Sequence, residues 1–157
     1  MSIQRYERPM SLASACALLD EHPGQALALA GGTDLIGDIH AGRQVEYVVD
    51  IKRIPELQTI EWTPDGTLVI GSCVAMGRVA EDGRIQKRYT ALTMAAGGVA
   101  TTQIRNRATI AGNLGNASPC ADTAPPLLVL GAVMRIQFPS GVRDEPFHGF
   151  IRDCRKT

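Results

Sequence analysis

Helical and strand patterns alternate over residues 1–50, and this order limits the folds open to the chain. Residues 11–21 carry alanine and leucine at helical spacing, and Ser11 is placed to cap the helix. Apolar runs at 25–30 and 46–51 predict short buried strands, and a glycine turn with a second predicted helix lies between them. Helix, strand, helix and strand in this order indicate a small α/β unit with a parallel strand pair.

The pattern changes after Pro55, where turn chemistry replaces the long helical periodicity. Residues 63–66 (Thr-Pro-Asp-Gly) and 139–141 (Pro-Ser-Gly) each separate two apolar runs, which predicts two antiparallel hairpins. Further helices are expected over residues 76–82, 89–100 and 122–130. We therefore predict an α+β protein of two lobes, a small α/β lobe over residues 1–55 and a larger lobe with antiparallel sheet and helices over residues 56–157.

The charge balance argues against several kinds of partner. The 157 residues carry 16 basic and 16 acidic side chains, and aromatic residues make up 4%. A neutral chain with few aromatic rings is not expected to bind nucleic acid or an anionic membrane surface. Apolar runs fall short of the roughly 18 residues that a membrane span needs. Residues 1–9 lack the apolar core of a secretion signal, so we expect a cytoplasmic protein.

Side chains suited to metal binding or acid–base catalysis are not grouped in the sequence. The four cysteines and three histidines are scattered, without the spacing of a metal site. No Gly-x-Ser-x-Gly nucleophile motif occurs. We therefore predict no metal ligand, no catalytic side chain and four reduced thiols.

A glycine pair follows the first predicted strand, in the segment Leu29–Leu35 (Leu-Ala-Gly-Gly-Thr-Asp-Leu). Glycine lets the backbone approach a ligand closely, and the N–H groups at a helix start favour an anion. Thr33 or Asp34 is expected to cap the helix that follows. The alternative is a turn that only needs positive φ, because the spacing matches neither GxGxxG nor a P-loop.

A second glycine-rich segment spans residues 109–122 and carries two asparagines, hydroxyl side chains and one carboxylate. Its alternating glycines predict an irregular loop and not a helix. Such a stretch is suited to lining the phosphates and hydroxyls of a nucleotide cofactor. The alternative is a surface loop whose polar side chains bond their own backbone. Arg105 and Arg107, just before it, are expected to be solvated; a phosphate or the acidic face of a partner protein is the alternative.

Together these segments resemble the FAD-binding subunit of the molybdenum hydroxylases, the family of xanthine dehydrogenase, carbon monoxide dehydrogenase and 4-hydroxybenzoyl-CoA reductase. The resemblance rests on Ala-Gly-Gly-Thr-Asp-Leu at 30–35, Val-Val-Asp-Ile-Lys-Arg-Ile-Pro-Glu-Leu at 48–57, the block at 103–122 and Arg-Lys-Thr at 155–157. These motifs follow the order of the family over nearly the whole chain.

The resemblance implies a two-lobed fold with FAD between the lobes. The backbone of residues 30–34 and of residues 109–113 would hold the pyrophosphate from the two sides. Asp122 matches an acidic residue beside the polar part of the flavin, and Val99 matches a position that lines the cofactor. The implied cofactor-binding residues are Leu29, Ala30, Gly31, Gly32, Thr33, Asp34, Leu35, Val99, Thr109, Ile110, Ala111, Gly112, Asn113 and Asp122.

The resemblance also implies electron transfer within a larger complex. An iron–sulfur subunit would hold [2Fe-2S] clusters and a molybdopterin subunit would hold the molybdenum centre. Electrons would pass from the clusters through FAD to NAD+ or another acceptor. The chain would then be an oxidoreductase component that is inactive alone.

Three departures from the family pattern leave other functions open. Ala111 replaces a glycine, which is tolerable where φ is negative, and residues 152–154 differ from the family just before Arg-Lys-Thr. The chain ends at Thr157, before the strand and the C-terminal domain with which the family continues. One alternative is a truncated, non-catalytic remnant that acts as a scaffold. Another is a flavoenzyme that works alone, for which the sequence offers no base at a substrate site.

Overall fold

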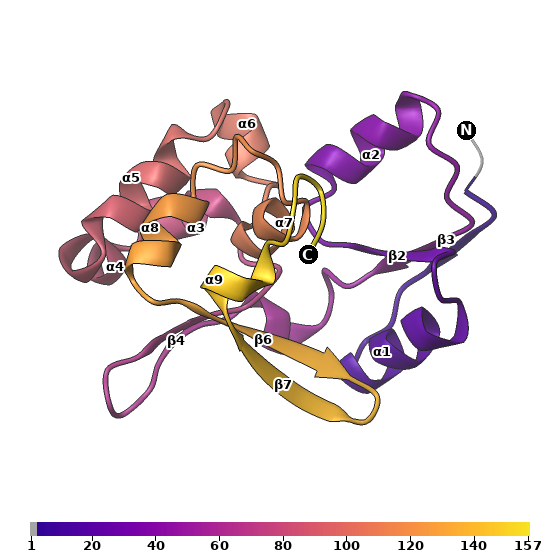
Figure 1. The fold of residues 1–157 in the computed structure, drawn as a ribbon, viewed down its shortest axis with the longest axis horizontal. Coiled ribbons are helices and arrows are strands. Elements are labelled where there is room, and N and C mark those ends of the chain that lie inside the picture. Colours follow the sequence, from indigo (N-terminus) through magenta and orange to yellow (C-terminus); the bar gives the residue numbers. More distant parts are fainter. Residues whose placement is uncertain (1–2) are drawn as a thin grey trace.

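A computed structural model describes residues 3–157 and shows two lobes side by side (Figure 1). Residues 1 and 2, which the sequence assigns to the first lobe, lie outside the described part. The mixture of helices with parallel and antiparallel strands confirms the predicted α+β class. The elements of the first lobe are β1 (Arg5–Glu7), α1 (Leu12–Glu21), β2 (Ala26–Leu29), α2 (Thr33–His40) and β3 (Tyr47–Asp50).

The first lobe is built on a parallel three-stranded sheet in the order β1-β3-β2. The predicted pair is β2 and β3, whose register sets Leu29 opposite Asp50. β1 is an additional strand that pairs with the other edge of β3; its three residues are too few to show a sequence pattern. Side chains of α1 pack with one face of this sheet and side chains of α2 with the other, so both faces are covered.

The second lobe combines two separate hairpins with short helices. The elements of the second lobe are the 3-10 helix η1 (Pro55–Gln58), β4 (Ile60–Trp62), β5 (Leu68–Ile70), α3 (Met76–Glu81), α4 (Gly83–Arg88), α5 (Thr90–Gly98), α6 (Thr102–Arg105), α7 (Ile110–Gly115), α8 (Ala124–Val129), β6 (Val133–Phe138), β7 (Gly141–Pro146) and α9 (Phe147–Phe150). Both hairpins form at the predicted turns, since β4 pairs with β5 and β6 pairs with β7, each pair antiparallel. The division of the chain at residue 55 stays a prediction.

Several local predictions are confirmed, and others are wrong. Ser11 caps α1, because its hydroxyl accepts a hydrogen bond from the Ser14 N–H at 3.2 Å. The predicted cap of α2 is wrong: neither Thr33 nor Asp34 but Gly32 occupies that position. The short helices α4 and α6 were not predicted, since runs of six and four residues give little periodicity.

Each lobe has its own apolar core, and segments far apart in the sequence join the lobes. In the larger lobe, buried side chains from α3, α4, α5 and α7 form one cluster that includes Met76, Ile85, Leu92 and Leu114. The β6–β7 hairpin reaches across to α1, where the Cys16 thiol donates to the Gln137 carbonyl at 3.7 Å (Figure 1). Across residues 3–157, no helix has both the length and the apolar character to span a bilayer.

A buried carboxylate lies at the carboxyl end of β3. Asp50 accepts from the Tyr6 hydroxyl and from the Lys52 N–H at 3.0 Å, and its side chain is only 3% exposed. The Lys52 ammonium lies 2.8 Å from the same carboxylate and Arg8 lies 3.8 Å from it. Burial opposes ionisation of Asp50, but the hydrogen bonds from Lys52 and Tyr6 outweigh it and hold the pKa below its usual value. This network ties β1 to the end of β3.

Candidate functional site

The first glycine segment runs from the carboxyl end of β2 into the start of α2. Gly32 is the N-cap of α2. Its φ of +81 is a backbone conformation that residues other than glycine rarely adopt. No side chain accepts a hydrogen bond from the first turn of this helix. The amino end of α2 therefore presents backbone N–H groups and the positive end of its dipole.

Gly31 of the first glycine segment lies against the backbone that leads into the second. A Cβ at this position would overlap the carbonyl oxygen of Arg107, and it would lie 2.9 Å from that carbonyl carbon and 3.0 Å from the Ala108 Cα. Only glycine permits so close an approach of the two backbones. The second glycine segment begins directly afterwards, at Thr109, so the contact sets both segments beside one another.

The backbone that Gly31 contacts, at residues 107–108, is held by the larger lobe. The Ala108 carbonyl accepts a hydrogen bond from the Met76 N–H at 2.8 Å, and Ala75 forms an antiparallel bridge with Thr109. Met76 and Ala108 both belong to the buried core of that lobe. Gly31 therefore rests on a backbone that cannot move without disturbing the core.

The second glycine segment begins as a helix, which corrects the predicted loop. Residues 110–115 form α7, and the buried Thr109 caps it by accepting from the Gly112 N–H at 3.0 Å. Ile110 and Leu114 are buried, and this burial outweighs the poor helix propensity of the glycines. Ala111 lies within α7 and is not among the residues with positive φ, so alanine is tolerated there.

A hydrogen bond from the segment before α8 fixes the Asn113 side chain of α7. The hydroxyl of Thr123, which is fully buried, donates to the Asn113 Oδ1 at 2.7 Å. Asp122, the residue before it, is exposed in the turn that leads to α8. The bond therefore attaches the residue next to Asp122, at the end of the second glycine segment, to Asn113 near its beginning.

Replacing Thr109 by valine is expected to destabilise the protein by about 1 kcal/mol, because the change removes the cap but keeps the methyl group. Urea unfolding followed by circular dichroism measures this loss. The matched control is Thr101→Val, which removes the exposed cap of α6, where the hydroxyl accepts at 3.4 Å. Equal losses for the two variants would contradict a special role for the Thr109 cap.

The remaining predicted site residues divide into buried and accessible ones. Leu29 and Ile110 are buried in the cores of the first and second lobe, so only their backbones can face a ligand, while Leu35 is half-buried and packs on the first core. Val99 ends α5 and is half-buried, and its carbonyl accepts from the Arg105 guanidinium at 3.0 Å. The accessible or half-accessible predicted residues are Ala30, Gly31, Gly32, Thr33, Asp34, Ala111, Gly112, Asn113 and Asp122.

Sequence reasoning missed residues whose hydrogen bonds support the predicted site residues. The Arg105 guanidinium, predicted to be solvated, is half-buried and donates to the Val99 and Ala100 carbonyls and to the Thr102 hydroxyl, each at 3.0 Å. Thr123 and Arg155 each contact an asparagine of the second glycine segment. Their separations along the chain leave no local pattern, so no sequence signal marks these pairs.

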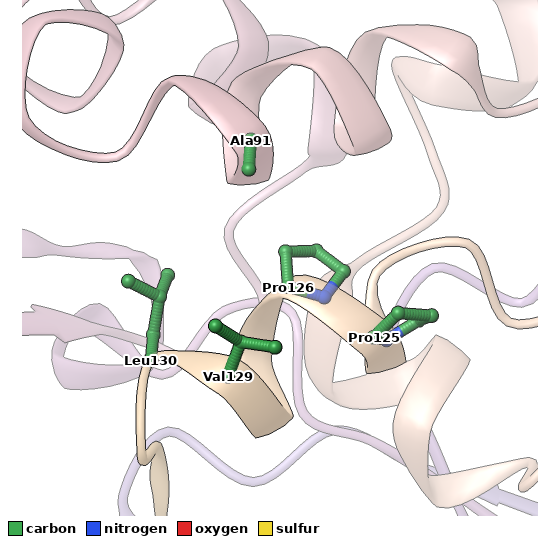
Figure 2. A pocket seen from close by; sticks show the side chains of 5 residues that line it. All are labelled: Ala91, Pro125, Pro126, Val129 and Leu130. Carbon is green, nitrogen blue, oxygen red and sulfur yellow. The ribbon is translucent and has the colours of Figure 1, made fainter.

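An apolar hollow of about 300 Å³ lies on α8 and does not resemble the site just described. Figure 2 shows its lining, which consists of Ala91, Pro125, Pro126, Val129 and Leu130. None of these side chains can donate a hydrogen bond or carry a charge. The hollow therefore offers nothing to an anionic ligand.

The donor set of the two glycine segments fits a diphosphate. The amino ends of α2 and α7 supply backbone N–H groups, and the glycine contact at residue 31 keeps the segments together. Converging backbone amides stabilise concentrated negative charge without a lysine. No side chain in the two segments is placed as an acid–base pair, so the arrangement is suited to binding and not to proton transfer.

Comparison with known proteins gives one family for the whole chain. Residues 1–157 match the family model described as the FAD binding domain in molybdopterin dehydrogenase. The xanthine dehydrogenase FAD-binding subunit of Escherichia coli O157:H7 is 41% identical over 146 residues, which are 92% of this chain and 50% of that protein. The carbon monoxide dehydrogenase medium chain of Hydrogenophaga pseudoflava is 34% identical over 147 residues, 93% of this chain and 51% of that protein.

Solved structures have the same fold. Carbon monoxide dehydrogenase from Hydrogenophaga pseudoflava, in a form that lacks the Mo-pyranopterin moiety, superposes with a TM-score of 0.95 at 32% identity, over 99% of this chain and 54% of that one. Quinoline 2-oxidoreductase from Pseudomonas putida 86 gives a TM-score of 0.93 at 27% identity, over 100% and 54% of the two chains. The chain thus spans about half the length of the relatives it matches.

Proposed function

Because the chain belongs to the family of FAD-binding domains in molybdopterin dehydrogenases, we propose that it holds FAD as the flavoprotein part of a molybdenum hydroxylase-type oxidoreductase. The observation that carries the proposal is the contact of Gly31 with the backbone of Arg107 and Ala108, which joins the two glycine segments. A non-catalytic scaffold with the same fold would keep this contact, so uptake of FAD is the property that separates the two functions.

The backbone of Ala30–Asp34 and of Thr109–Asn113 is proposed to hold the FAD pyrophosphate. The N–H groups at the start of α2 donate toward negative charge, and the dipole of that helix adds to the attraction. Gly112 adds little bulk at the start of α7, and Asn113 keeps a fixed orientation through Thr123. Val99 and Asp122 are proposed to line other parts of the cofactor.

The protein supplies position and exclusion of water, while the bound FAD supplies the redox chemistry. In the proposed complex, an iron–sulfur subunit and a molybdopterin subunit are the partners, and electrons pass through FAD to NAD+ or another acceptor. The names of two relatives, an FAD-binding subunit and a medium chain, support a component of a larger assembly. The neutral net charge agrees with partners that are not nucleic acid.

Purified protein mixed with FAD is expected to retain the flavin through gel filtration and to show its visible absorption bands. FMN, which lacks the diphosphate and the adenylate half, is the matched ligand control and is expected to bind more weakly. The reason is that the proposed donors face the diphosphate and not the flavin ring. Quenching of flavin fluorescence gives both dissociation constants.

Two results would contradict the proposal. One is no uptake of FAD, even with the partner subunits present. The other is equal affinity for FAD and FMN, because the two glycine segments would then contribute nothing to binding.

A further inference from the structure

The C-terminal loop runs back from α9 between the two lobes. Figure 1 shows this loop beside α7. The Arg155 N–H donates to the Ala117 carbonyl at 2.9 Å, and the Lys156 N–H donates to the Asp153 carbonyl at 3.0 Å. The first bond attaches the loop to the residues that follow α7, and the second closes a turn within the loop.

The side chain of Arg155 reaches both lobes. Its Nη1 lies 3.4 Å from the Asn116 Oδ1, just after α7, and 3.7 Å from the Asp38 Oδ2 on α2. The Asp38 carboxylate also pairs with Arg43 at 3.2 Å within the first lobe. A single guanidinium therefore bridges the helices that begin at the two glycine segments.

The backbone at this bridge is held in an unusual conformation. Arg155 has φ +56 and Ala117 has φ +47, and the two residues are joined by the hydrogen bond between them. Left-handed backbone is unfavourable for both residue types and persists only where surrounding contacts hold it. The direction of the Arg155 side chain toward Asp38 depends on this conformation.

We propose that Arg155 is a positioning residue that fixes the two glycine segments relative to one another, and this inference rests on the proposed FAD site. The contact at Gly31 joins the lobes at the first glycine segment, while the β6–β7 hairpin contacts the first lobe at α1. The bridge from Asp38 to Asn116 adds a direct contact between α2 and the residue that follows α7. Since α2 is a rigid element, holding Asp38 also holds its amino end against α7.

The test replaces Arg155 by asparagine, which removes the guanidinium and tolerates positive φ. The dissociation constant for FAD is expected to rise about threefold to fivefold, which is the range for a partly exposed charge pair. The matched control is Lys156→Asn, which removes the same charge one residue later, where the ammonium pairs with Asp153 of the same loop and, within residues 3–157, with no carboxylate of the first lobe. The control variant is expected to bind FAD like the unaltered protein.

A double-mutant cycle with Asp38→Asn separates positioning from general destabilisation. In the Asp38→Asn background, the change at Arg155 is expected to have little further effect on FAD affinity. Arg155→Lys, which keeps the charge, is expected to recover part of the affinity. Additive effects in the cycle, or equal losses for Arg155→Asn and Lys156→Asn, would overturn the inference.

A measurement without FAD keeps this inference separable from the proposed function. Hydrogen exchange of the apo protein is expected to be faster over residues 36–41 in Arg155→Asn than in Lys156→Asn, because α2 loses its tether. Unchanged exchange would overturn the inference whether or not the protein binds flavin. Failure of the unaltered protein to bind FAD would instead overturn the proposed function.

Discussion

Replacing Gly31 by alanine is expected to weaken FAD binding at least about tenfold and to destabilise the protein by about 1–3 kcal/mol. The added methyl group would overlap the Arg107 carbonyl, which lies on a backbone held by the core of the larger lobe. The overlap is between two backbones, so no side-chain rotation can relieve it. Either the lobes separate at this contact or one glycine segment moves, and both outcomes would change the proposed pyrophosphate site.

The matched control for this prediction is Gly37→Ala. Gly37 lies within α2, and a Cβ there would meet nothing within 4 Å. Alanine in a helix interior is more favourable than glycine, so this variant is expected to be as stable as the unaltered protein or slightly more stable. Titration of flavin fluorescence and urea unfolding measure both effects. Normal FAD affinity in Gly31→Ala would show that the contact between the segments does not shape the site.

Replacing Asp50 by asparagine is expected to destabilise the protein by about 2 kcal/mol at neutral pH. The change removes the charge that holds Lys52 and the Tyr6 hydroxyl at the carboxyl end of the parallel sheet. The loss lies below the range for a fully buried ion pair, because Lys52 remains 28% exposed. Asp144→Asn is the control: it removes a carboxylate that is half-exposed and paired with Arg135, so a much smaller loss is expected.

The pH dependence of stability provides a second measurement on Asp50. Its pKa in the folded protein is lower than in the unfolded chain, so the folded state binds this proton more weakly. The stabilisation is therefore complete above the unfolded pKa, about 3.9, and is lost as pH falls through the lower folded pKa. Urea unfolding between pH 7 and pH 2 should show a smaller acid-dependent loss for Asp50→Asn than for the unaltered protein. Identical profiles would show that Asp50 contributes nothing to acid sensitivity.

The sequence predicted those elements whose signals are local. Alternating helix and strand patterns predicted α1, β2, α2 and β3, and turn residues predicted both hairpins. The Ser11 cap was predicted because a hydroxyl beside an apolar stripe acts within its own turn. The motifs at 30–35 and 103–122 also indicated the family, which the match over the whole chain confirms.

The failures occur where local preference and tertiary packing disagree. The glycines of residues 110–115 argued against a helix, but burial of Ile110 and Leu114 makes α7 a helix. The cap of α2 was assigned to Thr33 or Asp34, while the close approach at Gly31 requires a turn that ends at Gly32. In both cases a contact made by the folded chain outweighs an intrinsic preference of a fraction of a kcal/mol per residue, up to about 1 kcal/mol for glycine.

What the sequence determined by itself is therefore the helices and parallel strand pair of the first lobe, the two hairpins, the family and the two segments that we propose as backbone donors. The tertiary structure alone decided that Gly31 rests on Arg107 and Ala108, and that Arg155 reaches Asp38 on the other lobe. Periodicity and capping act over a few neighbouring residues, so they can be read from a single stretch of chain. Contacts between distant segments depend on how two separate cores pack side by side, and no local pattern encodes that arrangement.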